Sequence, residues 1–137
     1  MRNFRDLIVW RRSHQFVLSI YRLTDKFPRH EAFGLTSQIR RASVSIPTNL
    51  AEGCGRWGDG DMGRFVQIAM GSASEVDYLV LLASDLGYVP SADYIELASE
   101  LNEIRRMLTG FYKQIRSAGQ RKGGESAANS SHLKAKG

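Results

Sequence analysis

One segment of the sequence matches, letter for letter, a motif of nucleotide-binding chemistry. Residues 53–58 follow the pattern G-x-G-x-x-G, and Asp77 lies 19 residues after the last glycine. In dinucleotide-binding proteins this pattern joins a strand to a helix, and its glycines let the backbone approach a pyrophosphate. The residues before position 53 instead repeat apolar side chains at helical spacing. We therefore interpret the segment as a glycine-rich helix end, and we expect no nucleotide or other cofactor.

Residue types that could bind a metal or act as nucleophiles are present but not grouped. The three histidines lie far apart in the sequence: His14, His30 and His132. No Glu-x-x-His pair, the motif of di-iron helical bundles, occurs. Cys54 has Arg56 close by, which could lower its pKa, but nothing indicates a partner base. Residues 71–75 fall one residue short of G-x-S-x-G and follow a helical pattern. We expect no metal site, no catalytic site and no enzymatic activity.

Arginines on the polar sides of the expected helices are the remaining candidates for a functional surface. Guanidinium groups contact phosphates and contribute affinity without sequence specificity. Eight positions are candidate nucleic-acid contacts: Arg11, Arg12, Arg40, Arg41, Arg56, Arg64, Arg105 and Arg106. Taken singly, each is better explained by a solvated helix face or by an ion pair between subunits. In a ring of subunits, weak phosphate contacts would repeat and add through avidity.

Charge is distributed unevenly along the 137 residues, whose net charge is +5. Residues 1–60 hold ten basic and five acidic side chains, residues 61–104 hold one and eight, and residues 105–137 hold eight and one. A basic surplus permits contact with RNA, DNA or an acidic protein surface. The single cysteine, the lack of an 18-residue apolar run and an N-terminus without an apolar leader favour a cytoplasmic protein that does not contact membranes.

Apolar residues recur every three or four positions in four segments, which predicts four helices. The expected helices span residues 5–26, 35–53, 61–86 and 91–116, separated by Pro28, by the glycines of 53–60, and by Gly87 and Pro90. Short connections between amphipathic helices predict an all-α fold, an antiparallel up-down four-helix bundle over residues 1–116. Residues 117–137 contain one large apolar side chain, Leu133, and we expect them to form a flexible basic tail.

The first expected helix carries two apolar stripes that together cover an arc of roughly 200°, about twice the width that one core requires. The first stripe contains Leu7, Trp10, Val17, Leu18 and Tyr21. The second stripe contains Val9, Phe16, Ile20, Leu23 and Phe27. So wide an arc predicts a second buried surface, and hence self-association. We assign the second stripe to the interface between subunits, so that Phe16→Asp or Ile20→Asp should separate them.

Residues spread over the first three expected helices resemble those of a known family. The resemblance rests on residues 34–53, and also on residues 9–10, 21–28, 71–75, Arg56 and Phe65. These segments resemble the bacterial four-helix bundle protein family, also called the 23S rRNA intervening-sequence protein family and labelled ribosomal protein S23. The resemblance covers roughly residues 4–115 and implies an antiparallel four-helix bundle assembled as a homopentameric ring. It implies little about activity. Distant relatives in diversity-generating retroelements bind nucleic acid and a reverse transcriptase through basic surfaces, but no residue carries over from them by motif.

Two functional hypotheses follow from these patterns. In the first, a homo-oligomer binds nucleic acid, structured RNA in particular, through repeated arginine patches. In the second, a structural or adaptor oligomer presents a surface to a protein partner. The basic segments and the family's association with rRNA genes support the first hypothesis. The wide apolar arc of the first helix supports the second.

Overall fold

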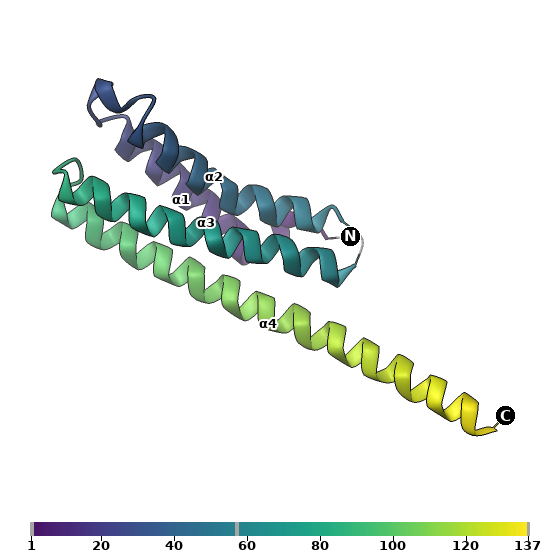
Figure 1. The fold of residues 1–137 in the computed structure, drawn as a ribbon. Helices are drawn as coiled ribbons and strands as arrows, with labels where there is room; N and C mark the ends of the chain where they lie inside the picture. The colour runs from purple at the N-terminus through teal and green to yellow at the C-terminus, as the bar shows by residue number, and fades with distance from the viewer. Residues whose placement is uncertain (1, 57, 137) are drawn as a thin grey trace.

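Four helices and two short 3-10 turns make up the fold (Figure 1). The computed structural model describes residues 2–56 and 58–136, with side chains described as far as residue 119 except that of residue 59. The helices are α1 (Ile8–Thr24), α2 (Leu35–Cys54), α3 (Asp59–Asp85) and α4 (Ser91–Lys136), and the turns are η1 (Phe4–Asp6) and η2 (Arg29–Glu31). No strand occurs in these described ranges, so the predicted all-α class is confirmed.

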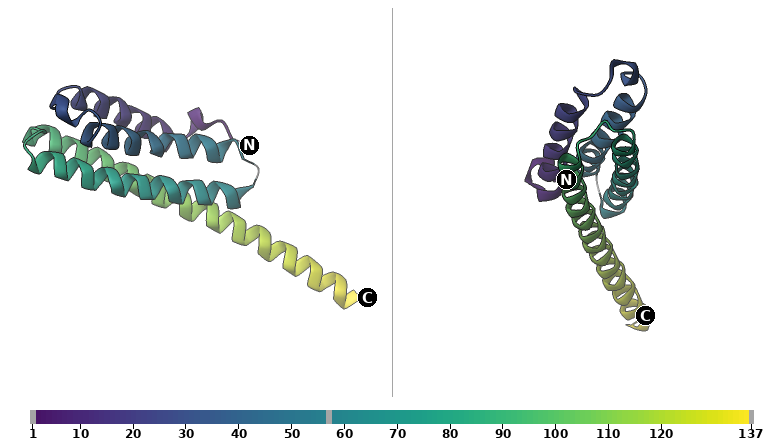
Figure 2. Two further views of the ribbon diagram at one scale, coloured as in Figure 1. Left: turned by 45° about the horizontal axis from the view of Figure 1, so that its top comes forward. Right: turned by 90° about the vertical axis from the view of Figure 1, so that its left-hand side faces the viewer.

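Each helix runs antiparallel to the one before it and packs along its side, and α1 also contacts α4 (Figures 1 and 2). The order along the chain is therefore up-down-up-down. The connection from α3 to α4 shows how the sequence imposes a reversal. Gly87 has a φ of +82°, the left-handed region that glycine favours. Its N–H donates to the Ser84 carbonyl at 3.0 Å, and the Tyr88 N–H donates to the Ala83 carbonyl at 2.9 Å. These two bonds form a Schellman motif that ends α3.

The core contains the stripes expected from the spacing of apolar residues in α2, α3 and α4. From α2, Ile39, Ile46 and Leu50 are fully buried. Val76 and Leu79 of α3 are buried as well. The inward positions of α4 are Leu97, Leu101, Ile104, Leu108 and Ile115. The apolar face of each helix is thus buried against the other helices, and this shared core stabilises a four-helix bundle.

The structure corrects the expected subunit interface on α1. All five residues of the second stripe are buried within the single chain: Val9, Phe16, Ile20, Leu23 and Phe27. They form part of the core and are not available to a second copy. Leu18 and Tyr21 of the first stripe are the exposed ones, at 44% and 42%. The expectation chose the wrong stripe because spacing alone shows two apolar faces and does not say which one the other helices cover.

Helix α4 is longer than the sequence pattern predicts. The pattern ends the helix near residue 116, whereas α4 continues to Lys136 and projects past the other three helices (Figure 2). Residues 117–136 contain no proline, which would stop a helix, but their three glycines and four serines have low helix propensity, so local composition does not explain the extension. The flexibility of residues 117–137 stays a prediction.

Helix α3 is long and apolar enough, by length and composition alone, to cross a membrane over residues Gly60–Asp85. In this fold, however, 44% of its most apolar window is buried inside the bundle. The same composition is typical of the core helix of a helical bundle. The apolar character of α3 therefore has an explanation within the fold.

We expect Ile39→Asp and Ile20→Asp to unfold the chain. Both side chains are 0% exposed. Losing a buried isoleucine costs about 2–5 kcal/mol before desolvation of the new carboxylate is counted. That loss approaches the total stability of about 5–15 kcal/mol that a domain has. Thermal melting followed by circular dichroism measures the effect. Ile95→Asp is the control because Ile95 is 68% exposed, and it should melt like the parent. Native melting of Ile20→Asp would contradict its placement in the core.

Candidate nucleic-acid interface

Five of the eight candidate arginines form ion pairs within the chain. The pairs are Arg12–Glu103, Arg40–Asp25 at 3.0 Å, Arg56–Glu52 at 2.9 Å, Arg64–Asp61 at 3.8 Å and Arg105–Asp77 at 3.0 Å. The carboxylate partner of each of these five arginines lies in the same chain, so these pairs do not depend on a second subunit. Exposed pairs of this kind contribute about 0–1 kcal/mol each. They hold the guanidinium groups in place without excluding contact with a ligand.

Arg40 has the most extensive set of partners among the eight. Its Nε donates to Thr24 Oγ1 at 2.8 Å, and one Nη donates to Asp25 Oδ1 at 3.0 Å. The guanidinium also lies 4.5 Å from the centre of the Tyr21 ring. Thr24 Oγ1 in turn donates to the Ile20 carbonyl at 2.7 Å. Arg40 therefore joins α2 to the end of α1, which is a structural role.

Two of the three arginines of α1, Arg12 and Arg22, face carboxylates of α4. Burial raises the pKa of the Glu100 carboxyl above its usual range, and the neighbouring Glu96 raises it further. The guanidinium groups of Arg12 and Arg22 lie within electrostatic range of Glu100, and their positive charges partly offset that rise in pKa. Since Arg12 also pairs with Glu103, the positive charge of α1 on this side is largely balanced inside the chain.

Arg11, Arg41 and Arg106 are exposed and have no ion-pair partner among the described side chains. They belong to three different helices, α1, α2 and α4. The eight candidates are distributed over all four helices and the connection between α2 and α3. Six of the eight candidates are exposed, whereas Arg40 and Arg105 are half-buried. Whether any of them contacts nucleic acid stays a prediction.

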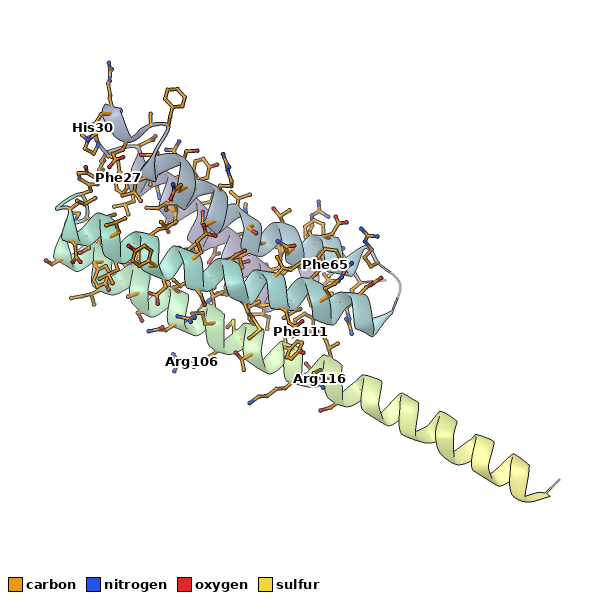
Figure 3. All side chains as sticks on the ribbon, in the orientation of Figure 1. Phe27, His30, Phe65, Arg106, Phe111 and Arg116 are labelled. Atoms are coloured by element: carbon orange, nitrogen blue, oxygen red, sulfur yellow. The ribbon has the colours of Figure 1, made fainter. Side chains whose placement is uncertain are left out.

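Basic residues are instead concentrated in the sequence of the C-terminal part of α4. From residue 105 to its end, the chain carries eight Lys or Arg residues and one carboxylate, that of Glu125. Arg106 and Arg116 lie along α4 toward the point where it leaves the bundle, far from the end marked by Phe27 and His30 (Figure 3). Lys113 and Arg116 were not among the predicted contacts. The charge count of residues 105–137 was the signal that could have identified them.

The glycine-rich segment has a packing explanation. A Cβ on Gly53 would lie 2.6 Å from Met62 Sδ and 3.1 Å from Phe65 Cβ, so the close approach of α2 to α3 requires glycine there. The Cys54 side chain is buried, and this burial raises the pKa of its thiol despite the opposing charge of Arg2. Arg56 pairs with Glu52 and does not activate the thiol. The helical context preceding the segment is confirmed.

No cluster of three or more metal-ligating side chains occurs among the described residues. His14 stacks on Trp10, with ring centres 5.1 Å apart and planes 10° from parallel. His30 lies in η2 at the opposite end of the bundle (Figure 3). His132 is in the part of α4 beyond the described side chains. The two described histidines are therefore not placed to share a ligand.

The exposed stripe of α1 forms one wall of an apolar groove. The groove lies between α1 and α2 and has a volume of about 780 Å³. Trp10, Leu18 and Tyr21 line it from α1, and Val44 and Pro47 line it from α2. An exposed apolar groove marks a surface at which a protein segment or another apolar ligand can bind. It lies on the opposite stripe of α1 from the one predicted.

Comparison with known proteins agrees with this architecture of four antiparallel helices. The family model described as 23S rRNA-intervening sequence protein matches residues 5–110. The chain therefore belongs to the 23S rRNA-intervening sequence protein family, and the resemblance found in the sequence is confirmed.

A solved structure shares the fold. It is a protein of unknown function from the S23 ribosomal protein family of Bacteroides thetaiotaomicron, with a TM-score of 0.72 and 24% sequence identity. The similarity covers 77% of this chain and 96% of that one. Among curated proteins, no match was found.

We expect Arg40→Ala to lower the free energy of unfolding by roughly 1–2 kcal/mol, because it removes charge-assisted bonds from a partly buried guanidinium. Chemical denaturation measures the difference. Arg41→Ala is the matched control, since Arg41 is the next residue, is exposed and has no described ion pair. Equal midpoints for the two variants would show that the Arg40 contacts do not stabilise the fold.

Proposed function

We propose that this protein is a non-enzymatic homo-oligomer of the cytoplasm that binds nucleic acid, structured RNA in particular, through basic surfaces. The observation that supports this best is the basic run on α4. Eight positive side chains and one carboxylate follow position 104, on a helix that extends past the bundle (Figure 1). A projecting cationic helix can reach phosphates without steric hindrance from the other three helices. Arg11, Arg41 and the loosely paired Arg64, on the other helices, add positive charge.

Self-association is the second part of the proposal, and the α1–α2 groove supports it. Its proposed occupant is the outer face of α3 from a second copy. Ile68, Tyr78 and Leu81 of α3 are exposed by 42% to 61%. Part of the charge is complementary as well, since Arg11 of α1 has no ion pair among the described side chains and α3 contains more carboxylates than arginines. A contact between two different faces is heterologous and can close into a ring. We infer a ring of five from the family resemblance.

We expect wild-type protein to bind a 23S rRNA fragment with an affinity that falls steeply as salt rises. Each phosphate contact contributes a slope of about −0.7 to −0.9 in log K against log salt. Arg106→Gln combined with Lys113→Gln should weaken binding and make that slope shallower. Fluorescence anisotropy over a salt series, with an unrelated RNA in parallel, measures both effects.

The matched control is Lys26→Gln combined with Arg29→Gln. It removes the same charge from exposed residues at the opposite end of the bundle, and RNA affinity should change little. If wild-type protein bound no RNA even at low salt, the RNA proposal would be wrong. The alternative function, an adaptor oligomer that uses its surface for a protein partner, would then be favoured by the groove.

We expect Leu18→Asp to dissociate the oligomer while leaving the subunit folded. Leu18 is 44% exposed and lines the groove, so the carboxylate costs little in the free subunit and much in an apolar interface. Light scattering gives the mass and circular dichroism the helicity. Ile95→Asp is the control, because Ile95 is exposed on α4 outside the groove. An unchanged mass for Leu18→Asp would refute the groove as the interface.

A further inference from the structure

A second, smaller groove lies where α4 leaves the bundle beside the start of α3. It has a volume of about 350 Å³. Arg64 and Gln67 line it from α3, and Tyr112 and Arg116 line it from α4. We propose that this groove binds a backbone phosphate of the nucleic acid. The inference rests on the proposed function and assigns it a specific site.

The polar groups of this groove are predominantly hydrogen-bond donors. Gln67 Nε2 donates to Tyr112 Oη at 2.9 Å, and Arg116 Nη1 donates to the same oxygen at 3.4 Å. The Tyr112 hydroxyl thus accepts twice, and its own proton has no acceptor among the described residues. Together with the remaining guanidinium N–H groups, this exposed proton can donate to an oxygen-rich ligand in place of water. A phosphate supplies several such oxygens and a negative charge.

Arg64 is available to a ligand despite its carboxylate neighbour. Its Nη2 lies 3.8 Å from Asp61 Oδ1, longer than a hydrogen bond, and the Arg64 side chain is 61% exposed. The guanidinium rests 4.9 Å from the centre of the Phe65 ring, which orients it without using its N–H groups. Arg64 can therefore turn its donors toward the groove at little cost.

The walls of the groove leave room for a backbone to approach. Gly60, Gly63 and Gly119 line it and contribute no side chains. A Cβ on Gly60 or Gly119 would meet nothing within 4 Å, so the space beside both glycines is open. At Gly63 a Cβ would lie 3.7 Å from the edge of the Tyr112 ring. The Tyr112 ring therefore lies in ordinary van der Waals distance of the α3 backbone at Gly63, and its hydroxyl is held between Gln67 and Arg116.

Charge around the groove favours a nucleic-acid phosphate over a free one. Arg116 belongs to the basic run that continues along α4, so a strand held in the groove would follow further positive charge. A free phosphate would use the groove alone. A polyanion would use the groove and the rest of α4 together, and would gain affinity from both.

The decisive experiment compares RNA binding by Arg64→Gln combined with Arg116→Gln, and by Tyr112→Phe, in the full-length chain. The double variant should lose about tenfold or more in affinity, as expected for charge-assisted contacts. The slope of log K against log salt should become shallower by about one phosphate contact.

Tyr112→Phe removes only the hydroxyl and should weaken RNA binding by about two- to tenfold with an unchanged slope. Lys26→Gln combined with Arg29→Gln is the charge-matched control and should bind like the parent.

A parallel titration with inorganic phosphate follows the Arg64 and Arg116 Nε–H resonances by NMR. Phosphate should shift both resonances in the parent, and weaker shifts are expected in Tyr112→Phe. If the parent binds RNA and the double variant binds it equally well with the same slope, the groove inference is overturned while the proposed function stands. Phosphate shifts with unaltered RNA binding would identify a free-phosphate site and also overturn it. If the parent binds no RNA at all, both inferences fail.

Discussion

Burial of one apolar stripe from each of four helices is the constraint on which the rest of this structure depends. A helix of this length is not stable alone in water, and packing of its apolar face supplies the stability. The core of the bundle buries the face of α1 that contains Phe16 and Ile20. It cannot also cover the face with Leu18 and Tyr21, which remains exposed beside α2. The apolar groove is thus a consequence of an α1 helix with more apolar surface than three neighbours can bury.

The same packing decides which charges remain available. Antiparallel neighbours bring the arginines of α1 and α4 beside carboxylates of α4 and α3, as in Arg12–Glu103 and Arg105–Asp77. Arg40 is placed over Tyr21 and beside Asp25, where it joins two helices. These contacts leave an unbalanced basic run in the C-terminal part of α4, where no carboxylate lies between position 104 and Glu125. The proposed RNA surface follows from that imbalance.

Most of the fold could be predicted from the sequence. Helix periodicity is local, so the inward positions of α2, such as Ile39 and Ile46, could be recognised from spacing alone. Glycine and proline marked the helix ends for a similarly local reason, as Gly87 illustrates. The candidate site was predicted less well. Arg116, Tyr112 and Gln67 meet across two helices, and a spacing of 45 residues between Gln67 and Tyr112 gives no sequence signal of contact.

By itself, the sequence determined the number of helices, the residues that face inward on three of them, the uneven charge and the family. These properties depend on the types of neighbouring residues along one helix, or on motifs within it. Only the tertiary structure decided which of two apolar stripes of α1 lies in the core, and which arginines meet a carboxylate. Both questions depend on the rotation of each helix about its axis relative to its neighbours, and all four helices fix that rotation together when they pack.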